Sequence, residues 1–187
     1  MKVLFAVAPK KYRDNELLES IKVFESEGIK WGIASTVKGR CFGIMGGAVD
    51  ARRDFHNLSL VEKFDALIII GGPGAQEFLW KDSDLHDLIR VFNLAKKPIG
   101  AISLAPVALA AAGILEGKKA TVHPLRIAIH EMMKGDAIVI EDPVVRTGWI
   151  VTANNSSLAK EFAEKMIDVL NGKPEWEKAE SKLGFDF

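Results

Sequence analysis

The sequence has very little cysteine and no net charge. Cys41 is the only cysteine among 187 residues, so the chain can form neither an intrachain disulfide nor a cluster of thiolate metal ligands. Its 25 basic side chains are balanced by 25 acidic ones, which leaves no general positive field to attract nucleic acid or anionic lipid. We therefore expect no nucleic-acid partner and no metal site.

Long apolar runs are also missing. The N-terminal apolar stretch is too short for a signal-peptide core, and no stretch approaches a membrane span. Gln76 is the only glutamine, whereas lysine and glutamate are plentiful, a balance found in proteins from thermophiles. We expect a cytoplasmic protein with no membrane partner and no cofactor, and the composition hints at a thermophilic source.

The remaining composition is that of an ordinary globular protein, with 48% hydrophobic and 27% charged residues. A chain of this length buries enough surface to form a core without disulfides or metals. We predict one domain over residues 1–171. We expect the polar tail, 172–187, to dock on a partner subunit through its aromatic residues, Trp176, Phe185 and Phe187.

Short apolar strands alternate with amphipathic helices along the chain. This alternation predicts an α/β three-layer sandwich with a mostly parallel sheet, in which ligands bind beyond the carboxyl ends of the strands. The expected strands are 2–8, 29–35, 65–70, 98–102, 119–122 and 137–140; the expected helices are 14–27, 84–96, 105–112, 126–134 and 155–170; hairpins are expected over 39–50 and 144–153.

Ser103 lies where a predicted strand passes directly into a helix. Ala101 and Ala105, two residues to either side, are small enough to allow the tight turn of a nucleophile elbow. Backbone amides at the start of the helix could then hold an oxyanion. A serine at this junction is also an ordinary helix N-cap, and the spacing alone leaves both interpretations open.

Several segments resemble the DJ-1/PfpI family, which is similar to class I glutamine amidotransferases. The segments are 64–72 (FDALIIIGG), 97–102 (KPIGAI) and 112–125 (AGILEGKKATVHPL). The resemblance reaches to about Asn171 and implies a flavodoxin-like or glutaminase-like topology. The family places a nucleophilic cysteine at the elbow, so the resemblance implies that Ser103 replaces that thiol. Cys41 falls in the predicted hairpin, where we expect an inert thiol.

The resemblance also assigns a carboxyl group beside the nucleophile. By its spacing to Gly28 this group is Glu16, and Arg13 and Asp14 are the alternatives if the loop alignment shifts. Without a thiol, a serine needs a positioned base. His123 could supply one from the end of the following strand, or it could be a turn histidine beside Pro124.

The glycine-rich strand end at Gly71 and Gly72 lacks the spacing of a phosphate loop. We expect Gly71, Gly72 and Leu104 to form the substrate-binding backbone, with the amides of Gly72 and Leu104 as an oxyanion hole. His56, His86 and His130 fall in predicted loops or exposed helix positions, and we assign them no role.

Two classes of function follow. In the first, the altered elbow is non-catalytic and binds a small molecule. In the second, Ser103 is the nucleophile of a protease-, amidase- or esterase-like hydrolase. A third hypothesis, from the family's glyoxalase and deglycase chemistry, is that Ser103→Cys restores thiol activity. The resemblance further implies a homodimer, or a higher homo-oligomer, formed through the first helix and the glycine-rich hairpin.

Overall fold

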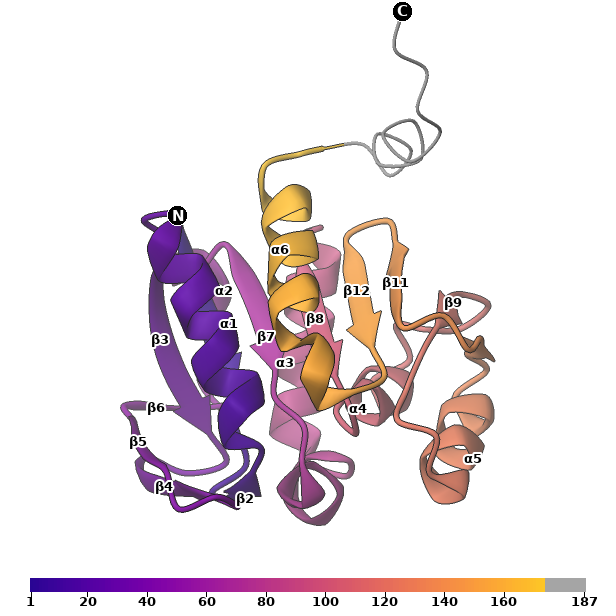
Figure 1. The fold of residues 1–187 in the computed structure, drawn as a ribbon, viewed down its shortest axis with the longest axis horizontal. Helices are drawn as coiled ribbons and strands as arrows, with labels where there is room; N and C mark the ends of the chain where they lie inside the picture. Colours follow the sequence, from indigo (N-terminus) through magenta and orange to yellow (C-terminus); the bar gives the residue numbers. More distant parts are fainter. Residues whose placement is uncertain (174–187) are drawn as a thin grey trace, which may run out of the picture.

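A seven-stranded, mostly parallel sheet forms the centre of the computed structural model, which describes residues 1–173 (Figure 1). The strand order is β11-β12-β8-β7-β1-β3-β6. Only β11 runs antiparallel to its neighbour. The strands span Lys2–Ala6 (β1), Lys30–Ser35 (β3), Arg53–Asp54 (β6), Ala66–Ile69 (β7), Ile99–Ile102 (β8), Val144–Thr147 (β11) and Ile150–Ala153 (β12). The three-layer α/β prediction is thereby confirmed.

Helices cover both faces of this sheet. The helices α1 (Asp14–Ser26) and α6 (Ala159–Leu170) lie side by side on one face, and α3 (Ser83–Leu94) packs on the other (Figure 1). A Cβ atom at Gly100 in β8 would lie 2.6 Å from the Phe162 ring and 2.8 Å from the sulfur of Met166. The glycine therefore allows α6 to pack closely on the sheet. The shorter helices are α2 (Leu60–Lys63), α4 (Pro106–Ala111) and α5 (Arg126–Lys134).

Two small sheets flank the central one. The predicted hairpin over 39–50 is present as β4 (Gly39–Gly43) and β5 (Ala48–Ala51), with β2 (Lys10–Tyr12) beside β4. The expected strand 119–122 is shorter than predicted. It forms β9 (Lys119–Ala120) and pairs with β10 (Ile138–Val139) outside the central sheet. One reason is that the Thr121 amide donates to the Thr152 hydroxyl, so it does not continue a strand ladder.

The other departures lie at element ends. The predicted helix 155–170 begins with a 3-10 turn, η2 (Ser156–Leu158), before α6. A π-helix, η1 (Ala75–Leu79), follows the glycine-rich segment. The aromatic residues of the predicted docking tail lie outside the described residues.

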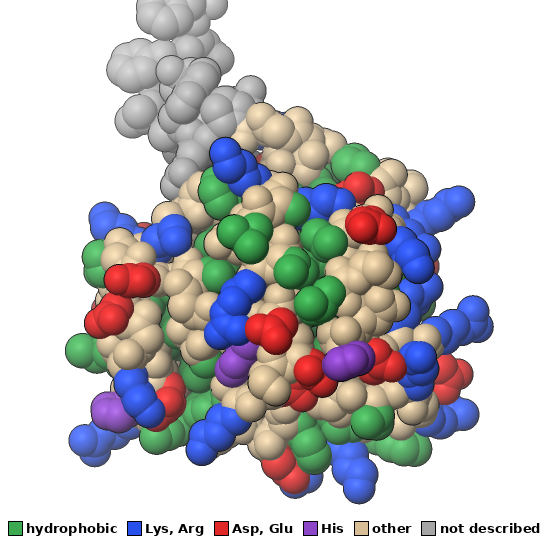
Figure 2. All heavy atoms as spheres, turned by 180° about the vertical axis from the view of Figure 1, so that it is seen from behind, with side chains coloured by type: hydrophobic (Ala, Val, Ile, Leu, Met, Phe, Trp, Pro, Cys, Tyr) green, Lys and Arg blue, Asp and Glu red, His purple; other side chains and the backbone are tan. Residues whose placement is uncertain are grey.

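Acidic and basic side chains are interspersed on the face shown in Figure 2. Within residues 1–173, no helix is long and apolar enough to cross a membrane.

Candidate functional site

Ser103 follows β8 in a backbone conformation that serine rarely adopts. Its φ is 61°, in the left-handed region, and its side chain is buried. Two backbone hydrogen bonds hold it: its N–H donates to the Ala153 carbonyl at 2.7 Å, and its carbonyl accepts from the His123 N–H at 2.9 Å. The surrounding strands therefore maintain the strained turn, a feature typical of functional sites.

Glu16 extends from α1 to the same strand ends. Its Oε2 accepts a hydrogen bond of 2.8 Å from the Gly71 N–H, while Oε1 is buried without a hydrogen-bond partner in the described chain. A Cβ atom at Gly71 would lie 2.9 Å from the Ser103 Cβ and 3.0 Å from Glu16 Oε2. Gly71 thus lies directly between the carboxyl group and the elbow.

Burial of Glu16 changes its protonation. Loss of solvent raises its pKa to about 8, although the Gly71 hydrogen bond, the Arg13 charge and, least of the three, the Ser103 hydroxyl lower it. Near neutral pH the carboxyl group is therefore mostly protonated. In that state the Glu16 carboxyl group has a proton to donate and cannot act as a base.

The alternatives to Glu16 have other positions. Both carboxylate oxygens of Asp14 bind the hairpin, accepting from the amides of Met45 at 2.8 Å and Gly47 at 2.7 Å. The Arg13 amide donates to the Gly71 carbonyl at 3.1 Å, and its buried Nε has no partner among the described residues. The geometry therefore places Glu16, rather than its neighbours, against Ser103.

Two backbone amides at the elbow have no acceptor. Within residues 1–173, the N–H groups of Gly72 and Leu104 donate no hydrogen bond, whereas the Gly71 amide is occupied by Glu16. Gly72 has a φ of +94°, and a Cβ there would lie 2.7 Å from the Arg13 nitrogen. Only glycine fits this position, so the chain can pass close to the backbone of residues 11–13 there.

His123 reaches the elbow through its backbone. Its ring Nδ1 lies 3.3 Å from the Asn154 carbonyl oxygen, and its main-chain N–H binds the Ser103 carbonyl. The described contacts include no hydrogen bond between the ring and the Ser103 hydroxyl. The structure thus brings the residue, but not its ring, into hydrogen-bond contact with Ser103.

The remaining thiol and histidines are distributed elsewhere. Cys41 is buried in β4, where burial raises its pKa. The prediction that His86 lies in a loop or at an exposed helix position was wrong. Its side chain is half-buried in α3, and its Nε2 lies 3.0 Å from the Trp80 carbonyl oxygen. Among the described residues, no group of three or more His, Cys, Asp or Glu side chains could hold a metal ion.

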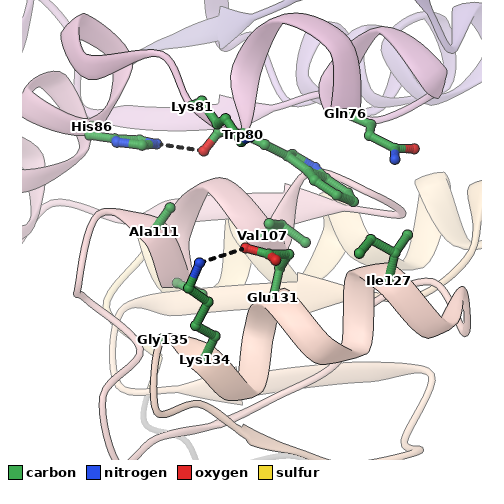
Figure 3. Close-up of a pocket in the computed structure, with 11 residues that line it drawn as sticks. Gln76, Trp80, Lys81, His86, Val107, Ala111, Ile127, Glu131, Lys134 and Gly135 are labelled. Atoms are coloured by element: carbon green, nitrogen blue, oxygen red, sulfur yellow. Dashed lines mark hydrogen bonds and ion pairs between the residues drawn. The ribbon is translucent and has the colours of Figure 1, made fainter.

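The sequence analysis missed a cavity of about 640 Å³ beside α4 and α5. Figure 3 shows it between Trp80 on one side and Ile127, Glu131 and Lys134 of α5 on the other. The α5 residues are spaced four and three apart and share one helix face. That spacing was visible in the sequence, but the element facing it was not.

Comparison with known proteins identifies the fold and the lineage. The model of the DJ-1/PfpI family matches residues 1–169. The chain belongs to the DJ-1/PfpI family. It is similar to an uncharacterized protein of Methanocaldococcus jannaschii, with 40% identity over 169 residues that cover 90% of this chain and 82% of that protein.

Other family members supply further comparisons. A deglycase of Pyrococcus horikoshii is 32% identical over 124 residues, which cover 66% of this chain and 73% of that protein. The crystal structure of a ThiJ/PfpI domain protein from Brachyspira murdochii matches with a TM-score of 0.86 and 32% identity, covering 92% of this chain and 98% of that one. The DJ-1/PfpI fold inferred from segments 64–72, 97–102 and 112–125 is thereby confirmed.

Proposed function

We propose that the elbow of this DJ-1/PfpI family member binds a small molecule carrying a carbonyl or carboxylate oxygen, and does not hydrolyse it. Ser103 stands, on this proposal, at the position where the family has its nucleophilic thiol. The unpaired amides of Gly72 and Leu104 supply donors for the ligand oxygen. Glu16, buried beside Ser103 and mostly protonated near neutral pH, adds no negative charge that would repel the ligand oxygen.

The burial of the Glu16 carboxyl group beside Ser103 is the observation that carries this proposal. A serine hydroxyl becomes a nucleophile only when a base removes its proton. With a pKa raised to about 8, the carboxyl group beside Ser103 already carries a proton near neutral pH. The His123 ring is directed to the Asn154 carbonyl oxygen instead. The elbow therefore offers donors to a ligand but lacks a positioned base.

The second candidate is a hydrolase with Ser103 as nucleophile and Glu16 or His123 as base. The φ of 61° at Ser103 favours it, because the same strained turn presents the serine in known hydrolases. A Ser–His pair would require the other ring nitrogen of His123, Nε2, to accept from the Ser103 hydroxyl, and no such hydrogen bond is present within residues 1–173. The deglycase name of the P. horikoshii relative belongs to that protein, and on our proposal its chemistry needs the thiol that Ser103 replaces.

Two measurements test the binding function. Amide chemical shifts should move saturably at Gly72 and Leu104 when pyruvate, a small keto acid, is titrated into the isotope-labelled protein. A fluorophosphonate probe should leave Ser103 unmodified on the folded protein, as judged by peptide mass mapping. A single adduct on Ser103 that is absent from the Ser103→Ala variant would establish the hydrolase instead. Unmoved Gly72 and Leu104 amides would count against the binding site.

We also propose that the chain forms a homodimer through α1 and the β4–β5 hairpin. Large apolar side chains are exposed there, with Leu18 at 49%, Phe42 at 51% and Met45 at 71% exposure. Asp14 at the start of α1 binds the hairpin turn through the Met45 and Gly47 amides. The hairpin turn is therefore tied to the start of α1, and a dimer formed through both elements would cover these exposed apolar side chains.

A further inference from the structure

We propose that the cavity between Trp80 and α5 is a second binding site, which takes a small molecule with a flat apolar group and one anionic end. Its volume of about 640 Å³ is within the range of sites that enclose a single organic ligand. Ser103, Glu16 and His123 do not line it. The side chains proposed to act at the elbow therefore take no part in this second site, and the link between the two is the hydrogen bond from Trp80 to the Leu104 carbonyl.

The apolar part of the cavity is built around a fixed indole. Trp80 donates from Nε1 to the Leu104 carbonyl at 2.7 Å, while its own carbonyl oxygen lies 3.0 Å from His86 Nε2. These contacts hold the ring in place before a ligand arrives, which reduces the entropic cost of binding. Aliphatic side chains complete the apolar lining: Val107, Ala110, Ala111 and Ile127. A flat aromatic group fits such a surface, because it can stack against the indole.

The charged part of the cavity is positive on balance. The single acidic side chain, Glu131, is paired with Lys134 at 3.9 Å. Lys81 is exposed and forms no ion pair within residues 1–173. Burial lowers the pKa of His86, so this histidine is mostly neutral near pH 7. One lysine charge is thus left over, and an anion is its complement.

The two parts are separated along the cavity. Figure 3 shows Lys81 and Lys134 toward the end occupied by His86, and Gln76 and Ile127 toward the opposite end. A ligand that places its ring on Trp80 can therefore direct a carboxylate to the lysine end. Gln76 comes from the π-helix η1, and π-helices are rare segments that occur frequently at functional sites.

The binding test uses 2-naphthoate as the probe and 2-naphthalenemethanol as its neutral counterpart, each titrated into the full chain by calorimetry. We expect saturable binding of one naphthoate per chain, and about tenfold weaker binding of the alcohol, because the lost contact is charge-assisted. Lys134→Gln should weaken naphthoate binding about fivefold, because it removes the lysine that pairs with the Glu131 carboxylate in the cavity. Lys160→Gln is the matched control, since Lys160 also forms a 3.9 Å ion pair within a helix, α6, away from the cavity.

A second variant fills the cavity without altering charge. Ala111 is exposed at the rim, so Ala111→Phe should fold normally and abolish naphthoate binding. The proposal is overturned if the wild type does not bind naphthoate saturably, if the alcohol binds equally well, or if neither variant weakens binding. Sedimentation tests the competing explanation that the cavity is an interface between copies of the chain. That explanation would be supported if the wild type does not bind naphthoate and Ala111→Phe changes the mass of the protein in solution.

Discussion

Glu16 and Gly71 are joined by a hydrogen bond of 2.8 Å from the glycine N–H to the glutamate Oε2, directly beside the Ser103 elbow. The bond fixes the carboxyl group at the ends of the parallel strands. This one hydrogen bond does not offset the loss of solvent around the carboxyl group, so the pKa of Glu16 rises to about 8. On our proposal, the elbow binds its ligand without hydrolysing it because this carboxyl group is protonated.

The first prediction concerns stability against pH. The pKa of Glu16 is raised from an ordinary value of 4.5 to about 8 on folding, so the folded chain binds a proton more tightly than the unfolded chain does. The contribution of Glu16 protonation to the free energy of unfolding is complete below about pH 4.5 and is lost as pH rises to about 8. Between these values the free energy of unfolding falls by about 1 kcal/mol per pH unit. Chemical denaturation should show this slope in the wild type.

The variant Glu16→Gln removes the titrating group and should remove the slope. Glu19→Gln is the control, because Glu19 lies on the same helix, is partly exposed and, within residues 1–173, forms an ion pair with Lys22 alone. If the wild type and Glu16→Gln have parallel stability profiles from about pH 5 to 8, the carboxyl group is not protonated in the folded protein.

The second prediction concerns Ser103→Cys. A thiol at this elbow would lie beside the unpaired amides of Gly72 and Leu104, which stabilise a thiolate. Cys41 serves as an internal control, since burial raises its pKa. Iodoacetamide labelling with mass mapping should modify the new cysteine at least about tenfold faster than Cys41.

Methylglyoxal turnover by Ser103→Cys should then be measured against the wild type. Turnover by the variant alone would show that the pocket retains the family's thiol chemistry. Slow labelling of both cysteines would mean that the elbow does not activate a thiol, and the thiol-replacement hypothesis would be wrong.

The third prediction concerns Gly71→Ala. The added methyl group would lie 2.5 Å from the Ile102 carbonyl oxygen and 2.9 Å from the Ser103 Cβ, so it would have to displace backbone. We expect a loss of about 2 kcal/mol or more in the free energy of unfolding. Gly28→Ala is the contrast: its φ is +67° but its Cβ would meet open space, and it should lose only about 1 kcal/mol. Equal losses in the two variants would contradict the close approach at Gly71.

The fourth prediction concerns the dimer. Met45→Glu places a charge on the exposed apolar surface of the hairpin and should halve the mass measured by sedimentation velocity, because burying that charge is unfavourable. Leu94→Glu is the control, since Leu94 is 79% exposed but lies on α3. A monomeric wild type, or a Met45→Glu variant that remains dimeric, would refute this interface.

Much of the fold could be predicted from the sequence. Apolar strands such as 65–70 and amphipathic helices such as 155–170 have periodic patterns that depend on local burial. The step from Ile102 to Ser103, between small alanines, predicted a tight turn. The structure adds the φ of 61°, which Ser103 keeps because Ala153 and His123 hold its backbone. The 119–122 segment has a strand-like pattern as well, yet Thr121 binds the Thr152 side chain rather than a strand.

The sequence by itself determined the alternating α/β architecture and the balance of charge, because each depends on neighbouring residues or on composition. Only the tertiary structure decided that Glu16, and not Asp14, faces the elbow, and that Trp80 faces Ile127 across a cavity. The two members of each pair, Glu16 with Ser103 and Trp80 with Ile127, are far apart in the chain. The pKa of a carboxyl group and the shape of a cavity depend on which distant segments exclude water, and a linear pattern does not specify them.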